Sequence, residues 1–322
     1  MPQLSCTLTV ADHLGGWKAR WGINRMSFLV PAGLYAIGEP GAEAPVVVTA
    51  NYKMSFDLVR RALGGRNVWL LVLETFGINV WCAAGKGTFG TEELVDRVAK
   101  SGLSGVVAHR RLILPILGAP GVSAHQVKKR SGFEVAYATI RASDLPEYLD
   151  NGERTTPAMR QLSFNWYERL VLVPVEMVLV LKSVALTGGA LYLAATLLAG
   201  AEAAATALVA YLGAVFTGVA AAPVLLPLLP GKSFAVKGAL AGLGYSALLY
   251  LFGGGAGWGL PVTFAAFLAL PALSAFYTLN FTGCTTYTSR SGVKKEMRLG
   301  LPAMGGALFA AALLLIAGSL FS

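Results

Sequence analysis

The sequence has few cysteines and no pair of them close together. Only three occur among 322 residues, at Cys6, Cys82 and Cys284, and none belongs to a Cys-x-x-Cys motif. Distant cysteines in odd number argue against a disulfide framework and are typical of a reducing compartment. The same spacing excludes the usual iron–sulfur motifs, so we do not expect the chain to hold its own cluster.

Charged residues are also scarce and unevenly distributed. They make up 13% of the chain, whereas 55% of the residues are hydrophobic, a balance too apolar for an ordinary soluble protein. Charges are spread through the first half, but from about residue 170 long apolar runs dominate. We therefore predict two domains, 1–165 and 166–322, with the boundary near the polar stretch 151–157.

The second domain is predicted to be an all-α transmembrane domain of five helices, because one span needs about 20 mostly apolar residues. Segment 170–181 precedes the first span and contains Pro174 and Glu176, with Lys182 after it. It is either an interfacial helix or the lower part of a long, tilted first span. Snorkelling to the interface accounts for both charges. The predicted spans are 184–200, 204–229, 235–252, 259–280 and 300–320.

Basic residues occupy alternate loops of this domain. The loops after the second and fourth spans carry Lys232, Lys237, Arg290, Lys294, Lys295 and Arg298. The loop 253–257 has no charge, so the positive-inside rule places the first domain in the cytoplasm and predicts a multi-pass protein of the cytoplasmic membrane. Residues 1–6 lack the pattern of a secretory signal. The net charge of +9 is then explained by the basic cytoplasmic loops and their attraction to anionic lipid. Nucleic acid is therefore not an expected partner.

The first domain alternates strand-like apolar runs with helical segments, which predicts a Rossmann-like α/β fold. The predicted strands are 45–49, 68–74, 112–114 and 133–140, and the predicted helices are 54–63, 91–101, 123–130 and 144–149. Thr91 is the expected cap of the second helix. Ligands bind beyond the carboxyl ends of such strands, so Thr49 and segment 74–86 could face one ligand.

Nucleotide-binding loops are missing from this domain. There is no Walker motif and no Gly-x-Gly-x-x-Gly that opens a helix. The run 85–90 is rich in glycine, but its spacing does not match a phosphate-binding loop. His109 and His125 also lack the spacing of a metal site, so both are expected to be ordinary core or surface residues.

Cys82 lies in the most informative segment of the chain. Asn79 is predicted to cap a short helix that has Cys82 in its first turn, where the helix dipole favours a thiolate. Ala83, Ala84 and Gly85 add little bulk beside it, so a large flat ligand with a central metal would fit against this helix. The alternative is that Cys82 is a small apolar residue that packs the helix onto the sheet.

Segment 79–86 resembles the signature of the HgcA family, the membrane corrinoid proteins of microbial mercury methylation. Its residues are Asn79, Val80, Trp81, Cys82, Ala83, Ala84, Gly85 and Lys86. The resemblance continues through 87–94, includes 48–57 upstream, and extends to the arrangement of one corrinoid domain and five spans. It thus covers essentially the whole chain. This family is related to the corrinoid iron–sulfur proteins of the acetyl-CoA pathway, which do not ligate cobalt with a cap cysteine.

The resemblance implies that 79–86 is a cap helix over a base-off, cobalamin-type corrinoid and that Cys82 is the lower axial ligand of its cobalt. It further implies a corrinoid-dependent methyltransferase that moves a methyl group, formally as a carbanion, from cobalt to Hg(II) and produces methylmercury. A strongly donating thiolate trans to the methyl group suits this transfer, so Cys82 is the expected catalytic residue.

The resemblance also implies partners. One is HgcB, a ferredoxin-like protein with two [4Fe–4S] clusters that returns cobalt to Co(I), and another is a methyl-donating methyltransferase. The alternative reading is a membrane-anchored corrinoid methyl carrier, or a corrinoid or metal transport protein, without mercury as its native substrate.

Several residues of the two matching segments have open roles. Thr49 either contacts the corrin ring or its tail, or is an ordinary strand-end hydroxyl. Asn79 caps the helix or contacts a corrin side chain, and Trp81 packs the helix or stacks on the cofactor. Lys86 either reaches a propionamide or phosphate, or is solvated.

The small residues of the signature are expected to act through their size. The resemblance places Ala83, Ala84 and Gly85, with Val80, against the corrinoid, so Ala84→Leu should clash with the ring. Cys284 and Cys6 could pass Hg(II), which prefers sulfur ligands, but small buried residues are the simpler interpretation of both.

Overall fold

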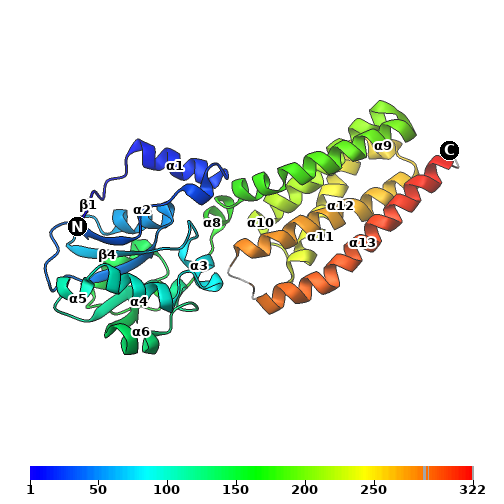
Figure 1. Cartoon of the computed structure of the whole chain (residues 1–322). Helices are drawn as coiled ribbons and strands as arrows, with labels where there is room; N and C mark the ends of the chain where they lie inside the picture. Colours follow the sequence, from blue (N-terminus) through cyan, green and yellow to red (C-terminus); the bar gives the residue numbers. More distant parts are fainter. Residues whose placement is uncertain (286–287, 289, 321–322) are drawn as a thin grey trace. The chain divides into compact units, whose positions relative to one another are not determined.

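The computed structural model describes residues 1–285, 288 and 290–320. The chain forms two compact units, Met1–Ser163 and Phe164–Ser322. The first unit is a mixed α/β domain and the second is helical (Figure 1). The predicted order of an α/β domain followed by an all-α domain is therefore confirmed.

A six-stranded sheet forms the centre of the first unit, in the order β1-β2-β4-β3-β5-β6. Its strands are β1 (Gln3–Leu4), β2 (Gly33–Ile37), β3 (Val46–Ala50), β4 (Val68–Leu73), β5 (Arg111–Leu114) and β6 (Glu134–Tyr137). The last four strands are parallel, whereas β2 runs antiparallel to β4. The carboxyl ends of β3, β4, β5 and β6 therefore lie along one edge of the sheet, called here the carboxyl edge.

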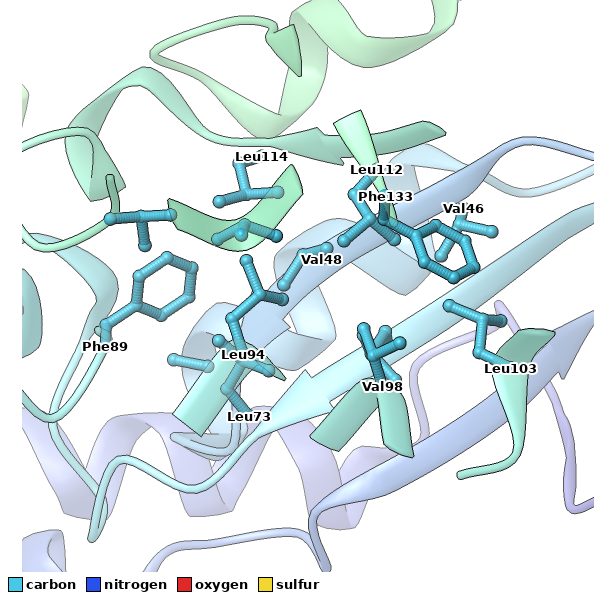
Figure 2. Packing of buried hydrophobic residues seen from close by; sticks show 14 of the residues in the cluster. Val46, Val48, Leu73, Phe89, Leu94, Val98, Leu103, Leu112, Leu114 and Phe133 are labelled. Carbon is cyan, nitrogen blue, oxygen red and sulfur yellow. The ribbon is translucent and has the colours of Figure 1, made fainter. Parts of the chain in front are cut away.

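Helices cover both faces of this sheet. One face is covered by α4 (Thr91–Lys100), α5 (Leu103–Val106) and α6 (Ala124–Ser131). Leu94 and Val98 of α4 and Leu103 of α5 are buried there in one cluster with Val46 and Val48 (Figure 2). On the other face, α2 (Lys53–Ala62) and α7 (Leu145–Asp150) pack Phe56 and Tyr148 against Val47. A strand buried on both faces needs a continuous apolar run, which explains the Val-Val-Val sequence of β3.

The predicted elements between residues 45 and 150 agree with the structure to within a few residues, except in one cap and in the extent of the last strand. Thr91 was expected to cap α4, but Gly90 is the N-cap and makes no side-chain cap bond. The Thr91 hydroxyl instead accepts a hydrogen bond from the Ser123 amide at 2.8 Å. No elements were predicted before residue 45, where the structure has β1, α1 (Val10–Arg20), the 3₁₀ turn Arg25–Ser27 and β2.

The second unit contains four helical stretches long and apolar enough to cross a membrane, among the residues that the structure describes: Trp166–Leu225, Phe234–Phe252, Leu260–Gly283 and Ser291–Ser319. Its helices are α8 (Trp166–Leu170), α9 (Val173–Phe216), α10 (Ala222–Leu225), α11 (Phe234–Phe252), α12 (Leu260–Asn280) and α13 (Arg290–Leu320), with a π-helical turn over Thr217–Ala221. The segment 173–181 is the beginning of α9, so it belongs to the long first helix and not to a separate interfacial one.

The first stretch holds two of the five predicted spans. It has 60 residues, about three times the roughly 20 that one crossing needs. Its backbone leaves the helical conformation at Gly200, with φ 87° and ψ 169°. Thr187 contacts the hydroxyl of Tyr211, and Val184 packs with Tyr211 and Val215. These residues are far apart along a straight helix, so the stretch folds back on itself at Gly200.

Small residues allow the helices of this unit to approach closely. A side chain at Gly218 would come within 2.6 Å of the Ser274 carbonyl oxygen, and one at Gly238 would meet Thr278 at the same distance. The hydroxyls of Ser274 and Thr278 donate to the carbonyls of Ala214 and Gly218, at 2.9 and 3.1 Å. Such contacts between small residues and buried hydroxyls are the usual basis of helix association in lipid.

Candidate functional site

The candidate site begins at the loop that joins β4 to α3 (Val80–Lys86), called here the β4–α3 loop (residues 74–79). Asn51, which follows β3 and is 1% exposed, organises this loop. Its Oδ1 accepts hydrogen bonds from the Thr75 amide at 3.0 Å and the Thr75 hydroxyl at 2.9 Å, while its Nδ2 donates to the Glu74 carboxylate at 2.6 Å. One buried amide therefore ties the carboxyl end of β3 to the chain that leaves β4.

The loop turns sharply against a segment far earlier in the sequence. Phe76 and Gly77 both have positive φ angles, 54° and 72°. A side chain at Gly77 would lie 2.8 Å from the Met26 carbonyl oxygen and 2.7 Å from Leu29, so only glycine fits there. Next to Met26, Arg25 lies over the ring of Tyr52, 5.5 Å from its centroid. Segment 25–29 is therefore part of the surroundings of the loop, and sequence reasoning missed it.

Asn79 is the N-cap of α3, as predicted. Its backbone is extended, and its Oδ1 accepts a hydrogen bond from the Cys82 amide at 2.9 Å. The helix has only seven residues and ends at Gly87 in the left-handed conformation. A helix this short is marginal without tertiary support, so its cap and the face it buries determine where Cys82 lies.

The two faces of α3 have different surroundings. Ala83 and Ala84 are buried in the domain core, and a side chain at Gly121 would come within 2.9 Å of the Ala84 Cα. Both therefore face the protein core, and their contact with a corrinoid stays a prediction. The two alanines are small because α3 packs closely on the protein itself.

The outward face of α3 carries Cys82, Gly85 and Lys86. Residues three and four positions apart share one side of a helix, which places Gly85 and Lys86 beside Cys82. Cys82 is half-buried, whereas Gly85 and Lys86 are exposed. A side chain built at Gly85 would meet no atom within 4 Å, so the space in front of this face is open. Trp81 is half-buried at its margin.

Burial raises the pKa of the Cys82 thiol above its ordinary value, while the charges of Lys86 and Arg25 and a hydrogen bond with Asn79 act in the opposite direction. Burial outweighs these effects, so the pKa of the thiol is raised overall. A metal ion would change this balance, because a coordinating thiol loses its proton outright.

Thr49 lies inside β3. It is buried and alternates with Val48, which places it with Val47 on the sheet face covered by α2. Ala83 and Ala84 of α3 pack with Val48 on the opposite face. The structure thus does not bring Thr49 to the open face of α3.

The remaining sequence candidates are Cys6, His109, His125 and Cys284. Cys6 is half-buried, and burial raises its pKa. His109 contacts the Ala44 carbonyl at 2.9 Å, and His125 contacts the Ser123 hydroxyl at 3.0 Å. Among the residues that the structure describes, no three His, Cys, Asp or Glu side chains gather as a metal site. The side chain of Cys284 lies outside the described part.

Fold and site together define the first unit as an α/β domain that presents a cysteine-bearing helix at its carboxyl edge. Residues 25–148 match the protein family described as the CO dehydrogenase/acetyl-CoA synthase delta subunit. This match begins in segment 25–29 and includes the β4–α3 loop and α3, so it covers the whole candidate site.

Individual relatives point to the same group of complexes. The chain is 32% identical over 123 residues to the acetyl-CoA decarbonylase/synthase complex subunit gamma of Methanopyrus kandleri, which is 38% of this chain and 26% of the relative. It is 31% identical over 124 residues to the same subunit of Methanocaldococcus jannaschii, covering 38% and 25%. The chain therefore spans about a quarter of the length of these relatives.

Proposed function

We propose that this chain is a membrane-anchored corrinoid protein of methyl transfer in which Cys82 is the lower axial ligand of cobalt. The observation that carries the proposal is the position of Cys82 on the open face of α3, next to the empty space in front of Gly85. The similarity of residues 25–148 to subunits of acetyl-CoA-synthesising complexes and the HgcA-like signature at 79–86 support it.

The residues present fit a corrinoid. A flat macrocycle needs a broad surface without projecting side chains, and Gly85 leaves such a surface one helical turn from Cys82. The donor at that surface is a soft sulfur, which suits a transition metal. Lys86, exposed on the same face, could bind an amide oxygen or phosphate at the rim of the ring. When bound, the corrinoid would supply a cobalt atom that carries the methyl group.

Cys82 would act by electron donation. As a thiolate it would hold cobalt and donate electron density to it, and protein ligands tune cofactor metals in this way. A corrinoid held by such a donor would supply a methyl group that is transferred, formally, as a carbanion. Hg(II) is an electrophile that requires the electron pair of a carbanion, so we propose it as the acceptor, with methylmercury as product.

The surrounding residues would hold Cys82 in place. Asn79 fixes the first turn of α3 through the Cys82 amide, and Asn51 fixes the loop that precedes it through Thr75. Ala84 seats the helix on the domain near Gly121. These three residues restrain the sulfur of Cys82 at the open face, and none of them is proposed to contact a substrate.

We further propose that the second unit crosses the cytoplasmic membrane five times. The stretch Trp166–Leu225 would make two crossings because it folds back at Gly200, and the other three stretches would make one each. The basic loops support a cytoplasmic position of the first unit. A ferredoxin-like protein with two [4Fe–4S] clusters, such as HgcB, would supply the electrons that return the cofactor to its reduced state.

The second candidate is a corrinoid methyl carrier that does not use mercury. The relatives favour it, because they are named as subunits of the acetyl-CoA decarbonylase/synthase complex. In that case the same cysteine would bind the cofactor, and the methyl group would pass to another protein.

One experiment separates these candidates. The full chain is purified from membranes in detergent, loaded with a corrinoid that carries a methyl group on cobalt, and compared with Cys82→Ala and with Cys6→Ser as the matched cysteine control. We expect a thiolate-ligated spectrum and methylation of Hg(II) in the parent and in Cys6→Ser, and neither in Cys82→Ala. A thiolate spectrum without methylmercury would favour the carrier. A Cys82→Ala variant that forms methylmercury at the parent rate would refute the ligand role.

A further inference from the structure

Helix α1 has an apolar outer face that remains exposed. Val10, Leu14, Trp17 and the C-cap Trp21 are 75, 56, 70 and 44% exposed. At 3.6 residues per turn these four side chains lie within an arc of about 60° on the helix. We call this surface the α1 face. Large apolar side chains gathered in one stripe mark an interaction surface, whereas single exposed ones are ordinary.

The opposite side of α1 is fixed to the domain. Ala19 is fully buried, and Gly15 faces the ring of Phe28. Asp12 forms ion pairs with Lys53 and Arg60 of α2, at 2.5 and 2.8 Å, and completes a capping box with Thr9. Helix α1 therefore lies against α2 (Figure 1) in one rotational setting, and the α1 face points away from the domain.

The charged residues of α1 indicate which kind of partner covers the α1 face. Lys18 lies on one side of the apolar stripe, and His13 and Arg20 lie on the other. The single carboxylate of the helix, Asp12, is on the inner side and engaged with Lys53 and Arg60. Tryptophan and leucine between flanking cations are the pattern of helices that lie in the plane of a membrane surface.

The chain itself brings a membrane close to this domain. The first unit ends at Ser163, and the first apolar stretch begins at Trp166, only a few residues later. The tether between this domain and the first apolar stretch is therefore short.

We propose that the α1 face is an in-plane membrane anchor, with Leu14, Trp17 and Trp21 inserted at the level of the lipid headgroups and Lys18 directed to their phosphates. Because Met26, shortly after α1, contacts the β4–α3 loop at Gly77, such an anchor would also hold the candidate site at the membrane surface. The proposal does not rest on the identity of the cofactor.

Nitroxide accessibility in the full chain tests the anchor. Cys6→Ser, Cys82→Ala and Cys284→Ser provide a background without native cysteines, to which Trp17→Cys, Leu14→Cys or Leu58→Cys is added singly. Leu58 of α2 is the matched control, because it is an exposed apolar residue, 49% accessible, in the same unit. The labelled proteins are placed in nanodiscs of phosphatidylethanolamine and phosphatidylglycerol. Collision rates are measured with oxygen, which concentrates in lipid, and with a nickel chelate, which remains in water.

We expect the ratio of oxygen to nickel collisions to be several-fold higher at positions 14 and 17 than at position 58. Equal ratios at all three positions would show that the α1 face is in water and would overturn the proposal. Low collision rates with both reagents at 14 and 17 would overturn it as well, because they would show that protein covers the face. Positions 14 and 17 are labelled in separate variants. If one substitution disturbs the fold, the other position still gives the result.

Discussion

Replacement of Asn51 by alanine is the sharpest test of how the domain positions Cys82. The side chain accepts two hydrogen bonds from Thr75 and donates one to Glu74, and it is almost fully buried. Alanine would leave the Thr75 amide and hydroxyl and the Glu74 carboxylate without this partner. Nothing else in β3 would change, because residue 51 follows its last strand position.

The expected loss can be worked out from these contacts. A neutral hydrogen bond contributes about 1 kcal/mol and one to a charged group about 1.5–3 kcal/mol. The Thr75 hydroxyl keeps a second acceptor, the Ile78 carbonyl at 2.8 Å, so it is left out of the sum. The bond from the Thr75 amide and the one to Glu74 sum to about 2.5–4 kcal/mol, and we take a value of about 3 kcal/mol because Glu74 is partly exposed. A loss of about 3 kcal/mol raises the opening equilibrium of the loop about a hundredfold.

Hydrogen exchange of the full chain in detergent, followed by mass spectrometry, measures this opening through a peptide that covers residues 74–79. We expect faster exchange in the β4–α3 loop and unchanged exchange in α4 on the sheet. The matched control is Asn67→Ala, which removes one exposed bond to the Glu39 amide. If the loop of Asn51→Ala exchanged at the parent rate, Asn51 would not hold the loop and the account of Cys82 positioning would be wrong.

Three further predictions concern α3 and the second unit. Asn79→Ala should destabilise α3 by about 1 kcal/mol and weaken corrinoid retention, whereas Asn79→Asp should keep the cap; equal retention in both variants would contradict this. Ala84→Leu should lower the melting temperature through a clash with the Gly121 backbone, at a cost of about 1–3 kcal/mol, while Gly85→Ala leaves it nearly unchanged because the space in front is open; the reverse order would show that α3 packs through its other face. Glu296→Ala should destabilise the helical unit by about 1 kcal/mol, since Glu296 accepts from the Ser233 hydroxyl and the Ala235 amide at the beginning of α11; thermal unfolding in detergent measures it, and the exposed Glu202→Ala is the control.

Much of the fold follows from local pattern. The apolar run of β3 and the spacing of α4 predicted their elements closely, because strand and helix periods are visible over a few residues. The first 37 residues gave no such signal. Strand β1 has only two residues, and α1 contains two glycines that lower its helix propensity, so tertiary contacts and the ion pairs of Asp12 maintain them.

The candidate site was predictable only in part. Asn79 was expected as a cap because an asparagine before a helical run satisfies free amides of the first turn. The role of Asn51 was missed, although the residue lies in the matching segment 48–57, since its partners Glu74 and Thr75 are 23 and 24 positions away. Segment 25–29 was missed for the same reason.

The sequence by itself determined the division into an α/β domain and an apolar helical domain, and it singled out Cys82 in a capped helix of small residues. These features depend on composition and on neighbours within one or two helical turns. Only the tertiary structure decided which side of that helix is open. It turned Ala83 and Ala84 into the core, left Gly85 facing empty space, and placed Thr49 on the other face of the sheet. The rotation of a short helix depends on what packs beneath it, and here that is Gly121, brought from 37 residues further along the chain.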